Sequence, residues 1–121
     1  MFYKSKVDCK AVYDIIISTV MSNLNHFVIT RTKADATTET IAAVDDRWGK
    51  IEQCADGTEV NIIYELFTRL LNDKGFSDIR SILRDMRQEK YLNCEADRLY
   101  RKRKIENTDT VACKMVVLYV K

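Results

Sequence analysis

The chain has 121 residues, 46% of them hydrophobic and 31% charged, which suits one packed domain with a charged surface and leaves no room for two domains of ordinary size. No apolar run approaches the roughly 20 residues that span a bilayer, and the N-terminal stretch lacks the pattern of a secretory signal. We therefore expect a soluble, cytoplasmic protein that has no membrane partner.

The positive charge is concentrated in the last third of the chain. Residues 1–75 contain nine Lys or Arg against eleven Asp or Glu, whereas residues 76–121 contain eleven against seven. The first part therefore has a net charge of −2 and the second a net charge of +4. This asymmetry favours an anionic partner for the C-terminal part, although a run of charges is also compatible with a solvated face.

Residues of the types that bind metals or catalyse reactions are not grouped in the sequence. The four cysteines, Cys9, Cys54, Cys94 and Cys113, are far apart, and the chain has one histidine. A structural zinc site needs four closely placed Cys or His ligands, so buried, reduced thiols are the better interpretation. Glycine-rich phosphate loops and the G-x-S-x-G elbow are absent. We predict no metal, no cofactor and no catalytic site.

The first 47 residues predict a helix, a strand and a loop. From Asp8 to about Asn25 apolar residues recur at helical spacing, and Asp8 suits the N-terminal cap. The β-branched and aromatic run Phe27–Thr30 predicts a short strand. Residues 31–47 are polar and small, so we expect a loop with at most a weak strand or turn around Ile41–Val44.

The middle of the chain predicts a β-hairpin followed by a helix. Two alternating runs flank Asp56-Gly57, a strong hairpin signal. The next helix should have Asn61 as its N-cap and end near Gly75, which suits a left-handed C-cap. We expect each of the three glycines in the chain to be required by a turn.

A second helix follows after a short connection, which predicts helix-turn-helix geometry. Over residues 77–89, Ile79, Ile82, Leu83 and Met86 form one apolar stripe and leave the arginines on the other side. The chain then becomes β-like in residues 92–94, 99–105 and 111–120, and the last of these strands should be well covered. The segment 98–105 contains five basic residues in eight positions.

This pattern favours binding of nucleic acid. Arginines on one side of a helix, followed by a basic hairpin, outline a winged-helix DNA-binding module whose contacts go mainly to phosphates. Strand alternation should place Lys102 and Lys104 on one face and Arg101 and Arg103 on the other. Tyr100 either stacks on nucleic acid or fills the base of the wing. Neighbouring carboxylates on the helix are an alternative partner for its arginines. The predicted DNA-binding residues are Arg80, Arg84, Arg87, Arg98, Tyr100, Arg101, Lys102, Arg103 and Lys104.

The order of motifs also resembles a known family. Trp48-Gly49-x-Ile51, a turn, a short strand, an apolar helix, Lys74-Gly75-Phe76, a second helix and the basic strand are similar to the C-terminal winged-helix module of AAA+ helicases carried by phages and staphylococcal chromosome cassettes, of the primase and minichromosome-maintenance-like group. The resemblance covers roughly residues 8–121. The ATPase part of those helicases, with its Walker motifs, is absent from this sequence.

The resemblance implies a module that helps a mobile-element helicase to engage DNA, as duplex or fork, or another replication protein. The alternative is a free-standing phage-type module that binds a host protein, for example as an inhibitor of a defence nuclease. For the fold we expect a single α+β winged helix-turn-helix domain over residues 1–121 with a small antiparallel sheet. We expect it to be divided into an N-terminal helix and strand (1–30), a loop (31–47) and a winged-helix core (48–121).

Overall fold

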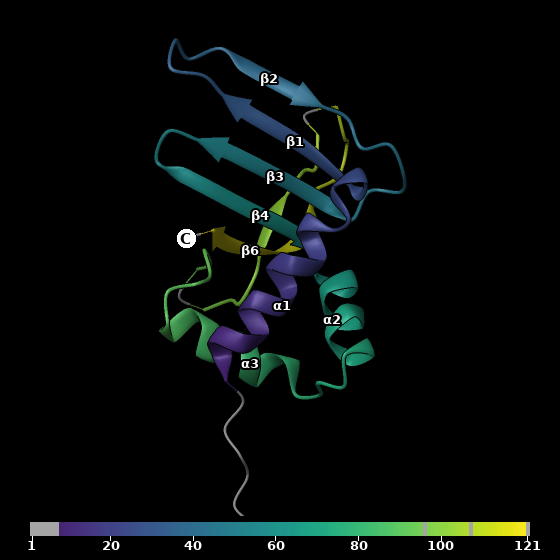
Figure 1. Cartoon of the computed structure of the whole chain (residues 1–121), viewed down its shortest axis with the longest axis vertical. Helices are drawn as coiled ribbons and strands as arrows, with labels where there is room; N and C mark the ends of the chain where they lie inside the picture. Colours follow the sequence, from purple (N-terminus) through teal and green to yellow (C-terminus); the bar gives the residue numbers. More distant parts are fainter. Residues whose placement is uncertain (1–7, 96, 107, 121) are drawn as a thin grey trace, which may run out of the picture.

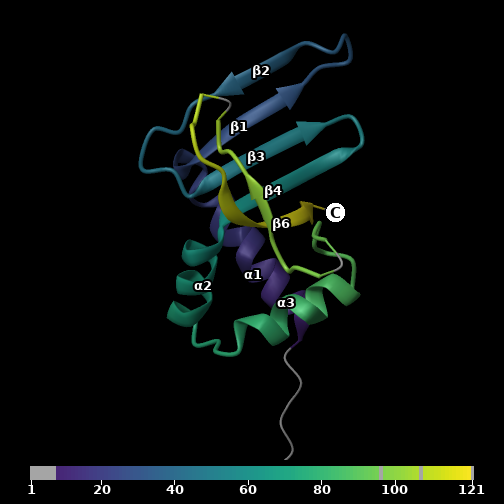
Figure 2. The same ribbon diagram turned by 180° about the vertical axis from the view of Figure 1, so that it is seen from behind.

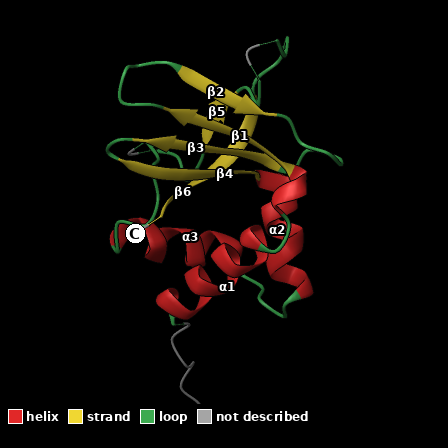
Figure 3. Ribbon diagram, turned by 45° about the horizontal axis from the view of Figure 1, so that its top comes forward, coloured by secondary structure: helices red, strands yellow, loops and turns green. Residues whose placement is uncertain are grey.

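A helical layer, a β-sheet and a folded-back hairpin are stacked on one another in the computed structural model of the chain, which describes residues 8–95, 97–106 and 108–120. Figures 1 and 3 show the three α-helices grouped on one side of the strands. The helices are α1 (Cys9–Met21), the 3-10 turn η1 (Leu24–His26), α2 (Tyr64–Asp73) and α3 (Ile79–Gln88); the strands are β1 (Phe27–Thr32), β2 (Thr38–Ile41), β3 (Gly49–Cys54), β4 (Gly57–Ile63), β5 (Arg101–Arg103) and β6 (Cys113–Val120).

The sheet has six strands in the order β2-β1-β3-β4-β6-β5, and every neighbouring pair is antiparallel except β1 and β3. The order of elements is that of a winged helix in α1, β4, α2, α3, β5 and β6, with β1–β3 inserted between α1 and β4. Strand β6 lies between β4 and β5 in the sheet. Strands β1, β2 and β3 extend this sheet beyond β4. The sheet is therefore larger than the small antiparallel sheet expected from the sequence, and residues 31–47 contain β2.

Alternation of side chains gives the sheet two different faces. The face that carries Phe27, Ile51 and Ile62 packs against α1, α2 and α3 and forms the main core. The opposite face carries Val28, which packs with Met115 and Val117 and with Ile105 from the hairpin. Strand β6 is buried on both faces, and residues 115–118 are all inaccessible to solvent or nearly so. The expectation that the last strand is well covered is confirmed.

The β5–β6 hairpin curls over the second face of the sheet instead of extending it in a plane. In Figure 2 this hairpin passes in front of β3 and β4, and Figure 1 shows it behind them. Its inward side chains reach two strands across, because Arg103 contacts side chains of β3 and β4. The hairpin is therefore packed against the second face of the sheet.

Two local predictions change in the structure. Asn61 does not cap α2; it is fully buried in β4, opposite Lys50 and Val117, and the strand continues to Ile63. Gly49 lies in β3 and is not a turn residue. A Cβ atom at position 49 would lie 1.8 Å from the carbonyl oxygen of Asn61, so the close approach of the backbones requires glycine there.

The helix-turn-helix geometry predicted from the sequence is confirmed. Helices α2 and α3 are joined by residues 74–78, where Gly75 has a φ of 91° and the Phe76 amide donates to the carbonyl of Leu71 at 2.9 Å. Helix α3 is capped by the carboxylate of Asp78, which accepts from the Ser81 amide at 3.4 Å. Asp8 caps α1 as expected, and its carboxylate accepts from the amides of Lys10 and Ala11. Among the described residues, no helix is long and apolar enough to cross a membrane.

Candidate nucleic-acid interface

Helix α3 presents a basic face to solvent. Ile82, Leu83 and Met86 are at most 4% exposed and fix the orientation of the helix against the core. The arginines at positions 80, 84 and 87 are all exposed on the other side. Within residues 8–95, 97–106 and 108–120, neither Arg80 nor Arg84 forms an ion pair. The carboxylates on α3 therefore do not neutralise these two guanidinium groups.

The inward arginines of β5 have partners within the protein. One Nη atom of Arg103 lies 3.1 Å from the side-chain oxygen of Asn61, 3.2 Å from a Glu59 carboxylate oxygen and 3.4 Å from that of Glu52. Glu52 and Glu59 face each other in the register of β3 and β4. Arg103 therefore bridges two opposed carboxylates and satisfies a buried amide oxygen.

Arg101, two residues earlier in β5, has a similar structural role. Its Nε donates to the side-chain oxygen of Asn93 at 2.8 Å, and a guanidinium nitrogen lies 3.9 Å from a carboxylate oxygen of Glu95. Asn93 in turn donates to Glu59. The two arginines and their partners form one polar network that holds the hairpin against the sheet.

The outward side chains of the hairpin remain exposed, and the alternation predicted for this strand is present. Lys102 and Lys104 are exposed, while Arg101 and Arg103 are half-buried. Lys102 lies directly opposite Lys114 in the β5–β6 register. Lys114 was not among the residues singled out from the sequence, because its position depends on the register of the hairpin. Antiparallel pairing of the predicted strands 99–105 and 111–120 was the signal that would have placed it.

Tyr100 is held among protein side chains. Its ring lies edge-on to that of Tyr64, with centroids 5.9 Å apart, and the ammonium of Lys114 lies 5.1 Å from its centroid. This geometry agrees with the role of filling the base of the hairpin. Arg98, just before it, is exposed and lies 3.9 Å from a Glu95 carboxylate oxygen at the surface, a distance at which exposed ion pairs contribute little.

The exposed basic groups come from α3, which belongs to the helical layer, and from the β5–β6 hairpin, which covers the opposite face of the sheet, and both elements are on the side toward the reader in Figure 2. Helix α3 lies behind α1 in Figure 1 and in front of it in Figure 2, and the hairpin is likewise nearest to the reader in Figure 2. Lys102, Lys104 and Lys114 form no ion pair within the described part of the chain. The surface formed by α3 and the outer face of the hairpin can therefore meet a polyanion.

The tip of the hairpin is fastened to the opposite end of the sheet. An Nη atom of Arg47 lies 2.8 Å from a Glu106 carboxylate oxygen and 3.0 Å from one of Asp109. Hydrogen bonds from Arg47 and from the Glu106 amide lower the pKa of Asp109, and the same contact with Asp109 raises the pKa of Arg47. The wing therefore has a fixed position next to the segment that precedes β3.

Residues of the kind that bind metals do not come together. Over the described ranges, no three His, Cys, Asp or Glu side chains are placed to hold a metal ion. None of the four cysteines is in a disulfide. Cys54 is exposed and Cys9, Cys94 and Cys113 are half-buried, so the expectation of buried thiols is wrong. His26 stacks on Trp48 with ring centroids 4.0 Å apart, and its Nδ1 donates to the Asp46 carbonyl oxygen at 2.7 Å.

The fold and the exposed basic helix define an α+β winged helix-turn-helix protein, which confirms the fold class inferred from the sequence. A family model described as the Cch helix turn helix domain matches residues 8–121, and the chain belongs to that family. Membership of a helix-turn-helix family indicates DNA as the partner. No curated protein and no solved structure matches the chain.

Proposed function

We propose that this protein binds the sugar–phosphate backbone of duplex DNA through α3 and the outer face of the β5–β6 hairpin. The observation that carries the proposal is the exposed pair Arg80 and Arg84 on the second helix of the helix-turn-helix, with no ion pair in the described part of the chain. An uncompensated guanidinium on such a helix is suited to phosphate oxygens, to which most protein–DNA hydrogen bonds are made.

The hairpin supplies a second set of contacts in this proposal. Lys102 and Lys114 are directly opposed in the sheet, and like charges in that position repel each other unless an anion lies between them. Each of them, together with Lys104, extends outward without a carboxylate partner in the described residues. A phosphate group at this face relieves the repulsion, so we include Lys114 in the interface.

The predicted binding residues then have two roles. Arg80, Arg84, Arg87, Arg98, Lys102 and Lys104 contact DNA. Arg101 and Arg103 support the surface by holding the hairpin on the sheet through Asn93, Glu59 and Asn61. Tyr100 packs between Tyr64 and Lys114 and keeps the lysine ammonium in place.

In this role the chain acts by binding alone, without a catalytic step. Its partner is DNA of a phage or other mobile genetic element during replication, and it works beside a helicase ATPase domain as an accessory domain. This setting is suggested by the resemblance of residues 8–121 to the helicase-associated module. The 121 residues act as a single unit, because one continuous sheet joins the N-terminal strand β1 to the C-terminal strand β6.

The salt dependence of duplex binding tests the proposal. Fluorescence anisotropy with a labelled duplex should give an affinity that falls steeply with salt, with a log–log slope of about −0.9 for each phosphate contact. An Arg80→Ala/Arg84→Ala variant should bind more weakly and have a slope smaller in magnitude by close to 2 units, if each arginine contacts one phosphate.

The matched control is Arg31→Ala/Lys33→Ala, which removes the same number of positive charges from the β1–β2 end of the molecule, far from α3 in Figure 1. This control should keep the wild-type slope to within a few tenths of a unit. Equal losses in both variants would mean that binding depends on net charge and not on α3, and the proposal would be rejected.

A further inference from the structure

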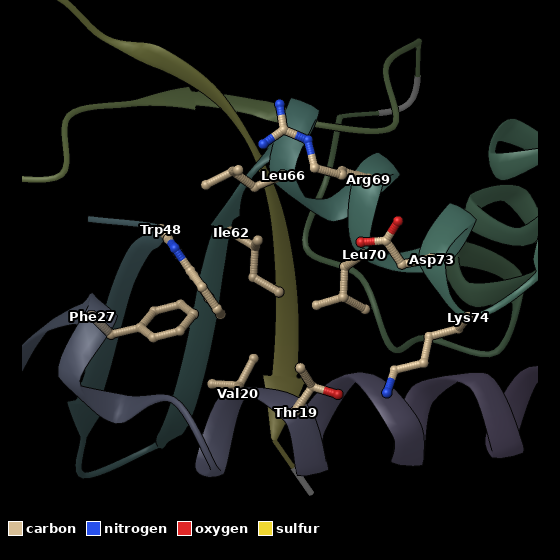
Figure 4. A pocket seen from close by; sticks show the side chains of 10 residues that line it. All are labelled: Thr19, Val20, Phe27, Trp48, Ile62, Leu66, Arg69, Leu70, Asp73 and Lys74. Carbon is tan, nitrogen blue, oxygen red and sulfur yellow. The ribbon is translucent and has the colours of Figure 1, made fainter. Parts of the chain in front are cut away.

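An apolar cleft lies on the helical side of the sheet, and no residue of α3 lines it. It has a volume of about 350 Å³ and is formed where α1, α2 and the sheet meet. Its apolar lining consists of Val20, Phe27, Trp48, Ile62, Leu66 and Leu70. Figure 4 shows Phe27 and Trp48 on one side of the cleft and Leu66 and Leu70 on the other. The wall is rigid, because the indole of Trp48 is stacked on His26 and meets the ring of Phe27 edge-on.

The rim of the cleft is mainly basic. Arg69 and Lys74 lie on the α2 side, together with Asp73, as Figure 4 shows. Both cations are exposed, and neither forms an ion pair within the described residues. The single carboxylate of Asp73 offsets only part of this charge. A ligand for this cleft therefore needs an apolar group with a carboxylate next to it.

The segment before β3 has this chemistry. Val44 is 85% exposed, the most exposed of the large apolar side chains in the described residues, and it is followed by Asp45 and Asp46. The amides of Val44 and Asp45 both donate to the carbonyl of Asn25, at 2.9 and 3.0 Å. These bonds hold the segment in place, so Val44 is presented to solvent by a fixed backbone.

Two more exposed apolar side chains lie in the sequence just before Asn25, the residue that holds this segment. Met21 and Leu24 are 44% and 39% exposed and come from the end of α1 and from η1, next to Asn25. Contiguous exposed apolar surface on a protein usually marks an interface. The N-terminal residues 1–7 are a poor match for the cleft in charge, because they carry Lys4 and Lys6 and no carboxylate.

We infer that the cleft is filled by a second copy of this chain, with Val44 of each copy entering the cleft of the other. Asp46 of one copy then faces Arg69 and Lys74 of the other. The projecting segment and the cleft lie at the same end of the molecule, since Trp48 of the cleft donates its amide to His26. A two-fold axis can therefore place both in reciprocal contact, as closed dimers require.

The dimer should be weak, because the area around one cleft and one loop is below the size of a standard interface. Sedimentation equilibrium of the full chain without DNA, from about 10 µM to 1 mM, should show a concentration-dependent rise in mass toward twice 14.1 kDa. The emission of Trp48, the only tryptophan in the chain, should shift over the same range.

Val44→Glu should abolish the association, and its high exposure means that the fold is not affected. The control is Val111→Glu, which makes the same substitution at another exposed valine, 74% accessible, and should dimerise normally. A chain that stays monomeric at 1 mM, or a dimer that is equally stable in Val44→Glu, would overturn the inference.

A charge exchange identifies the contact. Arg69→Glu and Asp46→Arg should each weaken self-association, because each places like charges together. A mixture of the two variants should associate again, since both reciprocal contacts then join opposite charges. Absence of this recovery would exclude the pairing. Failure here leaves the DNA-binding proposal intact, because the salt-dependence experiment involves neither the cleft nor Val44.

Discussion

Replacement of Arg103 by alanine distinguishes a supporting role from direct contact with DNA. The guanidinium is 26% exposed and bridges Glu59, which is 24% exposed, and Glu52. It also donates to the side-chain oxygen of Asn61, a residue that is fully buried and whose side-chain nitrogen already lacks a partner among the described residues. Its removal leaves two opposed carboxylates and an amide with neither polar atom satisfied.

The expected loss of stability follows from these contacts. A hydrogen bond from a charged donor contributes about 1.5–3 kcal/mol, and like charges opposed across a strand pair cost about 0.2–1 kcal/mol. The groups are about a quarter exposed, which reduces both values through solvent screening. We expect Arg103→Ala to lower the free energy of unfolding by about 2 kcal/mol, or Tm by roughly 8 °C for a chain of this length.

Urea denaturation followed by circular dichroism measures this change. The matched variant is Lys102→Ala, on the same strand but exposed and without an ion pair in the described residues, which should change stability by less than about 0.5 kcal/mol. Adding Glu59→Gln to Arg103→Ala should recover part of the loss by removing the repulsion. If Arg103→Ala were as stable as Lys102→Ala but bound DNA less tightly, the supporting role would be wrong and Arg103 would belong to the interface.

Three further predictions concern other parts of the fold. Arg47→Ala should speed amide exchange in the wing at neutral pH. The pKa of Asp109 is lowered in the folded state, so the stability that this contact supplies is present above the ordinary aspartate pKa and is lost as pH falls through the lowered pKa. Amide exchange in the wing should therefore depend less on pH in the variant than in the wild type between about pH 5 and pH 2. Gly49→Ala should prevent folding or greatly lower the urea midpoint, since its Cβ would overlap the Asn61 carbonyl; a near-normal midpoint would contradict this close approach. Asp78→Ala should cost about 0.5 kcal/mol, at the low end for an N-cap because the bond is long, and should weaken duplex binding through fraying of α3, as helix exchange rates would reveal.

The helix-turn-helix was predictable because its signals are local. The apolar stripe of Ile79, Ile82, Leu83 and Met86 specifies which side of α3 is buried, and Gly75 marks the turn by its left-handed conformation. The same stripe leaves the arginines of α3 exposed without any knowledge of the fold. The Asp56-Gly57 hairpin was also found from the pattern of neighbouring residues.

Asn61 shows where local reasoning fails. A polar residue before an apolar helix is a good N-cap, but position 61 is also the inward side of a strand that pairs on both edges, and the sheet extends to Ile63. Burial next to Arg103, 42 positions away, decided the outcome. Gly49 is similar, because the backbone that excludes a Cβ belongs to β4, across the sheet.

By itself, the sequence determined the helical elements, the basic second helix and the alternation of Arg101 and Arg103 with Lys102 and Lys104, since each depends on the period of a single element. Only the tertiary structure decided which face of that strand meets solvent. The hairpin curls back over the sheet, so the arginines became internal cross-links while Lys102 and Lys114 were brought together outside. Register and curvature arise from contacts between distant segments, and such contacts leave no periodic signal in the chain.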